Sequence, residues 1–169
     1  MNFWFQVLLV LWPMYLANSC AMLFGGKTPL DLNAKAWDGE RFLGKGKTFK
    51  GTFFGVFFGT LGAILALNVF PQAIASVFEN YALFGFAVAL GAVVGDILGS
   101  FIKRRLKIAS GKEALLLDQL GFFIVGILAG SFFFVPSMEQ ILVMAVATLL
   151  VHRFSNWIAF KTKLKEVPW

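Results

Sequence analysis

Long apolar stretches alternate with shorter polar segments along the whole chain. Five of these stretches reach the roughly 20 helical residues that are needed to cross a bilayer core. They cover residues 3–24, 52–70, 81–102, 115–135 and 141–160. The first two contain no charged side chain, and the third and fourth contain one carboxylate each, Asp96 and Asp118. The pattern predicts an all-α integral membrane protein, with five transmembrane helices that form a single transmembrane domain over residues 1–169.

Basic residues gather in alternate connections between these spans. Residues 25–51, residues 103–114 and the tail from 161 hold 14 of the 15 Lys and Arg residues. The connections on the other side contain only Glu79 and Glu139 as charged residues. Because positive charge is retained on the cytoplasmic side, we expect a multi-pass protein of the cell membrane with its N-terminus outside and its C-terminus in the cytoplasm. The segment 25–51 is then a long first cytoplasmic loop.

Composition removes several other classes of protein. Hydrophobic residues make up 59% of the chain and charged residues only 14%, although the net charge is +6. Soluble domains are roughly a quarter charged and about half apolar, so an ordinary soluble domain, a disordered chain and a DNA-binding basic module are excluded. We expect no nucleic-acid partner. The single Cys20 excludes an intrachain disulfide and any Cys-rich metal site.

Glycines recur every four residues in two of the expected helices. These glycines are Gly51, Gly55 and Gly59 in one helix and Gly91, Gly95 and Gly99 in the other. Such strips allow neighbouring helix backbones to approach closely. The spacing is compatible with packing alone and also with room for a lipid or a phosphate.

The first loop contains a cluster that could bind phosphate. Lys45, Lys47, Thr48 and Lys50 lie among glycines, which can offer backbone N–H groups and ammonium charge to an anion. It is not a Walker A motif, because Arg41 stands where that pattern requires its first glycine. The alternative interpretation is positive-inside charge on a solvated loop.

A second cluster closes the third span and faces the fourth. Asp96, Ser100 and Lys103 share one face of a helix, with Asp96 roughly 10 Å deeper than Lys103. A carboxylate at that depth is costly in lipid and indicates a functional site, or else an ion pair between helices. Asp118 enters the next helix at a similar depth. Two carboxylates below Lys103, Arg104 and Arg105 predict a Mg²⁺ site for phosphoryl or nucleotidyl transfer.

The last span contains His152 and Arg153. A single His in a membrane helix favours a hydrogen bond between helices over catalysis. Arg153 can reach the headgroups or pair with an acidic site residue. A general base is unnecessary in any case, because a phosphate nucleophile is already anionic at neutral pH.

Five motifs in this order resemble those of the CDP-archaeol synthases, which activate archaeal ether lipids with CTP. They are Pro13-x-x-x-Ala17-Asn18, Gly25-Gly26-x-x-Pro29-x-Asp31, Asp38-Gly39-x-Arg41-x-x-Gly44-x-Gly46-Lys47-Thr48-x-Lys50-Gly51, Gly95-Asp96-x-x-x-Ser100-Phe101-x-Lys103-Arg104-Arg105 and Asp118-Gln119-Leu120. The last two also resemble the signature of CDP-diacylglycerol synthases, except that Gly121 stands where that signature has a second Asp. This departure favours Asp96 as the partner of Asp118.

The resemblance implies a cytidylyltransferase that joins CTP to di-geranylgeranyl glycerol phosphate and releases diphosphate. Asp96 and Asp118 would hold Mg²⁺, with Asp96, Lys103, Arg104 and Asp118 as the catalytic group. The implied substrate-binding residues are Asn18, Asp31, Asp38, Arg41, Lys45, Lys47, Thr48, Lys50, Ser100 and Arg105. Of these, Lys45, Lys47, Thr48 and Lys50 would fold over the triphosphate as a lid.

Three other functions can be compared with this one. A small transporter or channel for an anionic solute would place polar residues along a path through the membrane, whereas here they cluster at one end of the spans. A CDP-alcohol phosphatidyltransferase would carry the series D-x-x-D-G-x-x-A-R, which the chain lacks. A purely structural membrane subunit would leave Asp96 without an explanation.

Overall fold

The computed structural model describes residues 2–163, except for the side chain of Leu115, and within that range the protein is built from helices alone. The helices are α1 (Phe3–Leu23), α2 (Phe49–Val69), α3 (Pro71–Ala75), α4 (Tyr81–Arg105), α5 (Leu115–Gly130) and α6 (Met138–Lys161). Two isolated antiparallel bridges, Pro29 with Thr48 and Lys35 with Arg41, shape the first loop without forming a strand. The prediction of an all-α protein is confirmed.

Helix lengths agree with the expected spans at four of the five positions. In the part of the chain that the structure describes, α1, α2, α4 and α6 are long and apolar enough to cross a membrane, and α5 is a shorter apolar helix. The expected span 115–135 differs most, because α5 ends at Gly130 after 16 residues, or about 24 Å. The next residues are apolar but form a turn before Pro136. The five-span topology therefore stays a prediction.

Two helix ends extend beyond the apolar stretches, and local interactions explain both. The Thr48 hydroxyl accepts a hydrogen bond from the Gly51 N–H at 3.1 Å, which caps α2 and lets it begin at Phe49. The second case is the C-terminal end of α4, which continues through Arg105. Three cations in that last turn, Lys103 to Arg105, suit the negative end of the helix dipole.

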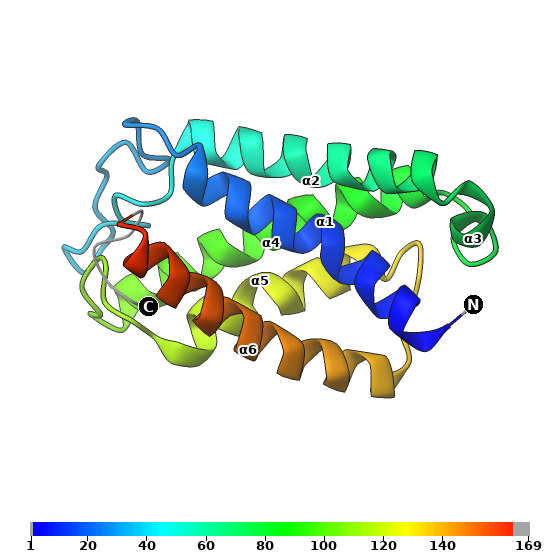
Figure 1. Cartoon of the computed structure of the whole chain (residues 1–169). Coiled ribbons are helices and arrows are strands. Elements are labelled where there is room, and N and C mark those ends of the chain that lie inside the picture. The colour runs from blue at the N-terminus through cyan, green and yellow to red at the C-terminus, as the bar shows by residue number, and fades with distance from the viewer. Residues whose placement is uncertain (1, 164–169) are drawn as a thin grey trace.

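Glycines bring α4 into close contact with its neighbours. A Cβ added at Gly59 of α2 would come within 2.6 Å of the Ala89 Cβ on α4. A Cβ at Gly95 of α4 would come within 2.4 Å of the Gly121 carbonyl oxygen on α5. Both positions exclude any larger residue, so the glycine strips serve close packing here. As a result, α4 lies against both α2 and α5 (Figure 1).

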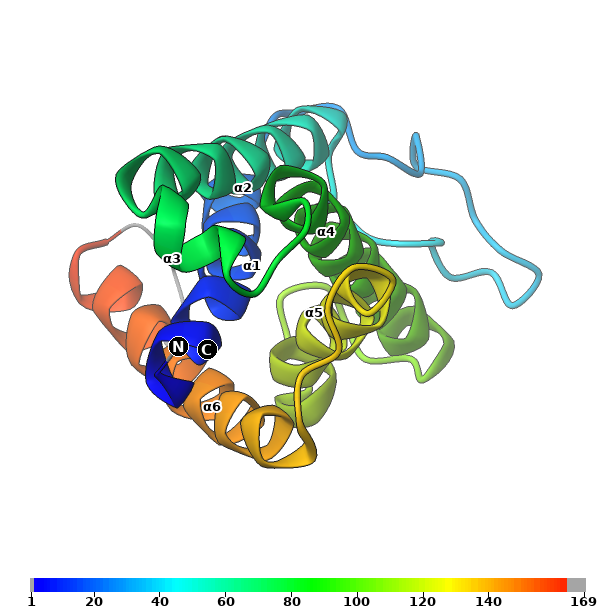
Figure 2. The same ribbon diagram turned by 90° about the vertical axis from the view of Figure 1, so that its right-hand side faces the viewer.

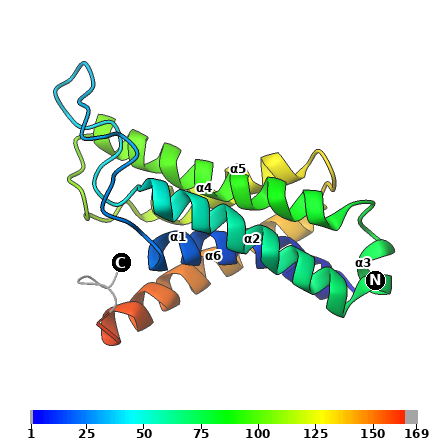
Figure 3. The same ribbon diagram turned by 90° about the horizontal axis from the view of Figure 1, so that it is seen from above.

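Helix α6 is joined to α1 by two side-chain hydrogen bonds. The Gln140 amide nitrogen donates to the Gln6 amide oxygen at 2.6 Å, and the Tyr15 and Thr148 hydroxyls lie 3.0 Å apart. Beyond these contacts, the C-terminal half of α6 leads away from the other helices (Figure 3).

The polar connections lie at one end of the helix bundle. The loop between α1 and α2, the loop between α4 and α5 and the C-terminal end of α6 share that end, whereas α3 lies at the other (Figure 1). This agrees with the alternation of charge in the sequence, with Lys161 and Lys163 on the basic side and Lys165 outside the described residues. We call residues 25–48 the cap loop, and Figure 2 shows that it extends sideways beyond α4.

Candidate functional site

A cavity of about 570 Å³ lies at the polar end of the bundle. Its walls come from α1, α2, α4, α5 and α6 and from the two loops at that end. Nine of the predicted site residues line it: Asn18, Lys45, Lys47, Thr48, Asp96, Ser100, Lys103, Arg104 and Asp118. The helical spacing that placed Asp96, Ser100 and Lys103 on one face therefore describes one wall of a real cavity.

Asp96 faces the cap loop across the cavity. Its carboxylate forms an ion pair with the Lys47 ammonium group, and both side chains keep about a quarter of their surface exposed. The close contact between Gly95 and Gly121 brings α4 against α5 at this level. The contact therefore sets Asp96 beside the helix that carries Asp118.

Asp118 is held by a lysine from the neighbouring helix. The Lys103 ammonium group lies 2.8 Å from each oxygen of the Asp118 carboxylate and donates a third hydrogen bond to the Lys112 carbonyl at 2.6 Å. The Ala114 N–H also donates to Asp118, at 2.9 Å. Lys103 is buried, yet 31% of the Asp118 side chain remains exposed. The carboxylate thus retains a surface that a ligand can reach.

Arg104 supplies a buried cation to the cavity wall. Only 6% of its surface is exposed, and its Nε atom has no hydrogen-bond partner among the residues that the structure describes. A buried polar atom without a partner costs on the order of 1–3 kcal/mol, more when it belongs to a charged group. Because Arg104 lines the cavity, an anion bound there would offer its Nε the missing partner.

Thr48 joins three parts of the site through one oxygen atom. Its hydroxyl accepts hydrogen bonds from the Gly51 N–H, at the start of α2, and from the Gly26 N–H, at the start of the cap loop, both at 3.1 Å. The residue is buried and also lines the cavity. Thr48 therefore fixes where the cap loop enters and leaves the bundle.

Asp31 organises the cap loop from inside it. The carboxylate is paired with Arg41 and accepts hydrogen bonds from the backbone N–H groups of Asn33, Leu43 and Gly44. Burial alone raises the pKa of the Asp31 carboxyl, but the Arg41 guanidinium and the three N–H donors outweigh that effect and hold the pKa well below its usual range. The carboxylate is fully satisfied within the loop.

The remaining predicted residues also lie outside the cavity lining. Asp38 is paired with Arg105 at 3.0 Å, and Arg105 donates a further hydrogen bond to the Arg41 carbonyl at 2.7 Å. Lys50 lies over the ring of Phe54 on α2, at 5.8 Å. The structure thus separates the predicted residues into a cavity group and a group that shapes the cap loop and its attachment to α4.

The sequence interpretation missed part of the cavity wall. Asn156 lines the cavity beside His152, and their side-chain nitrogens lie 3.1 Å apart. Polar residues four positions apart in an apolar helix share a face, so this spacing was the signal. From the loop between α4 and α5, Ser110 and Lys112 also line the cavity, but nothing in their spacing singled them out. Arg153 is exposed and is paired instead with the half-buried loop residue Glu113 at 3.3 Å.

The carboxylates of the cavity fit a cation that arrives with phosphates. Among the described residues, no group of three or more His, Cys, Asp or Glu side chains is placed to hold a metal ion. Asp96 and Asp118 nevertheless line the same cavity, and Mg²⁺ is usually held by one or two carboxylates together with substrate phosphates. The donor set therefore suits Mg²⁺ with a nucleotide and does not suit a metal ion held by protein side chains alone.

The apolar helices, together with a cavity lined by several cations at one end, are the features of a multi-pass membrane protein. A family model described as CarS-like, CDP-archaeol synthase, matches residues 1–169. The CDP-archaeol synthase of Methanocaldococcus jannaschii is 41% identical over 93% of this chain and 92% of its own. That of Pyrococcus abyssi is 39% identical over the full length of both chains.

A solved structure is also similar to this one. It represents an intramembrane enzyme for archaeal membrane lipid biosynthesis, is 33% identical, and superposes with a TM-score of 0.81 over 90% of this chain and 93% of its own. The chain belongs to the CDP-archaeol synthase family and is a membrane-embedded nucleotidyltransferase. The resemblance that the sequence motifs indicated is confirmed.

Proposed function

We propose that this protein joins CTP to an isoprenoid ether lipid phosphate of the di-geranylgeranyl glycerol type, giving a CDP-activated lipid and diphosphate. The observation that carries the proposal is the cavity itself, which is lined by Lys47, Lys103 and Arg104 together with two accessible carboxylates. Family membership supports the cytidylyl transfer. The position of the cavity at the end of the apolar helices suits a reaction between a water-soluble nucleotide and a lipid headgroup.

The transfer needs positioning more than proton chemistry. An oxygen of the lipid phosphate attacks the α-phosphorus of CTP, and the bond from that phosphorus to the bridging oxygen of the diphosphate breaks. The electron pair leaves with the diphosphate. Because the nucleophile is already an anion, the residues must mainly hold two phosphate groups in line and offset their negative charge.

The cations of the cavity are suited to that task. Lys47 and Lys103 now neutralise Asp96 and Asp118, and they would turn to phosphate oxygens when a nucleotide binds. Arg104 needs no such exchange, because its Nε is already without a partner. Mg²⁺ held by Asp96, Asp118 and the phosphates would supply further charge stabilisation. Asn18, Lys45, Thr48 and Ser100 line the same cavity and would position the nucleotide.

The residues outside the cavity lining act on the reaction indirectly in this proposal. Asp31, Arg41, Asp38 and Arg105 hold the cap loop in shape and against α4. The cap loop in turn carries Lys45 and Lys47 over the cavity. In this proposal the basic end of the protein faces the cytoplasm, with five spans and the N-terminus outside, which the gathering of positive charge at this end supports.

Product formation tests the proposal directly. Purified protein is incubated with CTP labelled in the cytidine, Mg²⁺ and the lipid phosphate, and we expect labelled lipid together with an equal amount of diphosphate. Omission of the lipid phosphate or of Mg²⁺ should abolish both products. Absence of a CDP-lipid, together with flux of an anionic solute into protein-containing vesicles, would support the transporter instead.

A further inference from the structure

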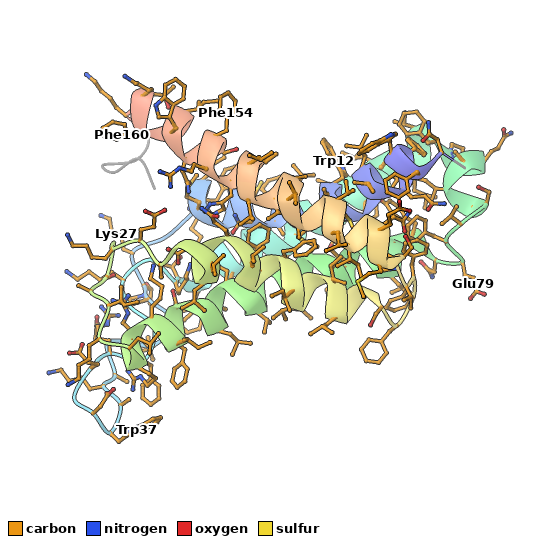
Figure 4. The ribbon with its side chains drawn as sticks, turned by 90° about the horizontal axis from the view of Figure 1, so that it is seen from below. Trp12, Lys27, Trp37, Glu79, Phe154 and Phe160 are labelled. Atoms are coloured by element: carbon orange, nitrogen blue, oxygen red, sulfur yellow. The ribbon has the colours of Figure 1, made fainter. Side chains whose placement is uncertain are left out.

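The tip of the cap loop presents a tryptophan that no described contact buries. Trp37 is 80% exposed and lies at the far end of the cap loop (Figure 4). It does not line the cavity. A large aromatic ring that is exposed to water gains no hydrophobic stabilisation. We therefore expect another molecule or surface to cover it.

The segment that carries Trp37 is a well-defined turn. The Gly39 N–H donates to the Ala36 carbonyl at 3.0 Å, and the Ala36 N–H donates to the Glu40 carbonyl at 2.8 Å. The Asp38 side chain accepts from the Glu40 N–H at 3.1 Å, and Gly39 adopts a φ of 81°, which glycine tolerates best. The turn therefore holds the Trp37 ring in one place before any occupant binds.

Arg105 attaches this turn to the outer side of α4. Its guanidinium is paired with Asp38 and lies over the rings of Trp37, at 5.3 Å, and Phe101, at 5.1 Å. The centres of the Trp37 and Phe101 rings are 6.4 Å apart. Trp37 therefore lies beside α4 at the level of Phe101, about one helical turn before the end of the helix.

That level matches the expected boundary of the hydrocarbon core. About 20 residues of helix cross the core, and counting from Tyr81 this length ends near Ser100. Leu98 and Ile102, on either side of Phe101 in the sequence, are exposed apolar residues of α4 and continue its lipid-facing surface. Leu32 of the cap loop is also exposed, at 66%. The apolar surface of α4 thus continues onto the cap loop.

We propose that the cap loop docks on the headgroup layer of the same bilayer through Trp37. Tryptophan favours this layer because its ring is apolar and its N–H can still find a polar partner. The occupant is the lipid interface, since the surface is continuous with the lipid-facing side of α4 and lies at its depth. Through Arg105 and Asp38, the docked ring holds the cap loop beside the helix that carries Asp96 and Arg104.

Quenching by brominated lipids tests this placement. The protein and its Trp37→Phe variant are reconstituted in phosphatidylcholine vesicles with bromine either near the headgroup or near the chain ends. The difference between their emissions isolates Trp37. We expect this signal to be blue-shifted and lost chiefly with bromine near the headgroup, with little loss to acrylamide in the water.

Trp12 provides a reference depth within the same chain. It lies near the middle of α1 and is half exposed, so the signal isolated with Trp12→Phe should be lost chiefly with bromine near the chain ends. Quenching of Trp37 by acrylamide but not by brominated lipid would overturn the proposal and leave the surface for a soluble partner. Quenching of Trp37 like that of Trp12 would overturn it too.

A spin label provides a second measurement that needs no Trp12 variant. A nitroxide on Trp37→Cys, with Cys20→Ser to remove the other thiol, should show intermediate accessibility to oxygen and to a water-soluble nickel chelate. High accessibility to the chelate, equal to that of a label at the exposed loop residue Lys107, would contradict docking.

Discussion

The carboxylates at the polar end of this protein occupy two different environments. Asp31 is paired with Arg41 and accepts three backbone N–H bonds, and its side chain is 1% exposed. Asp96 is paired with one lysine and its side chain is 29% exposed. A carboxylate whose lone pairs are all occupied within the protein stabilises a loop, whereas one with free lone pairs facing a cavity can bind a ligand.

The arginines differ in a related way. Arg105 has an ion pair, a carbonyl acceptor and aromatic rings around it, all of them outside the cavity lining, although its Nε also has no hydrogen-bond partner among the described residues. Arg104, the preceding residue on α4, has an unpartnered buried Nε and lines the cavity. Charged residue type and sequence neighbourhood alone therefore do not assign a role. What separates the two arginines is which of them lines the cavity.

The largest effect is expected from the open carboxylates. On the proposed function, Asp96→Asn and Asp118→Asn each remove a charge that would hold Mg²⁺, and each should lower the rate of CDP-lipid formation by on the order of 100-fold or more. Rates are measured with purified protein that retains its helical circular dichroism. Glu79→Gln, at the other end of the bundle, is the matched control and should keep its rate. A folded Asp96→Asn with normal activity would remove Asp96 from the site.

Arg104→Gln tests whether the Arg104 guanidinium, whose Nε lacks a hydrogen-bond partner, binds an anion. A hydrogen bond to a charged group contributes roughly 1.5–3 kcal/mol, so CTP should bind about tenfold or more weakly, as measured by isothermal titration. Without nucleotide, the variant should melt no lower than the parent protein, because it removes a buried Nε that has no hydrogen-bond partner among the described residues. Arg153→Gln, which changes an exposed arginine, should leave CTP binding unaltered. A variant that melts lower and binds CTP normally would make Arg104 structural.

Asp31→Asn should act on the cap loop first and on the reaction only through it. Loss of one partner of a buried ion pair costs roughly 3–5 kcal/mol, so the backbone N–H groups of Leu43 and Gly44 should exchange hydrogen faster. The KM for CTP should rise a few-fold with a smaller change in kcat. Glu40→Gln, at an exposed site in the same loop, should change neither. A fall in kcat alone would place Asp31 at the reacting groups.

The smallest effect concerns pH. Because its pKa is lowered, the Asp31 carboxylate stabilises the cap loop at every pH above its unfolded pKa of about 3.9, and this contribution declines as the pH falls below that value. Protection of the Leu43 and Gly44 amides should therefore be constant from neutral pH to about pH 5 and decrease only below about pH 4. A decrease centred near pH 6 would point to another group.

The sequence could predict most of the fold because the lengths of the apolar stretches can be read directly from the order of the residues. It could also predict the cavity wall on α4, since residues three and four apart share a helix face. It could not place the end of α5, because the residues after Gly130 are as apolar as the helix itself. Nor could it separate Asp31 from Asp96, because their partners, Arg41 and Lys47, are brought to them only by the folded loop.

The ion pairs of Lys47 with Asp96 and of Lys103 with Asp118 give the cavity its own counterions. On the proposed function, a divalent cation arriving alone must displace an ammonium group from its carboxylate. A nucleotide arriving with the cation supplies phosphate oxygens that pair with the displaced ammonium group. The two bindings are thus thermodynamically linked, and each must raise the affinity of the other by the same factor.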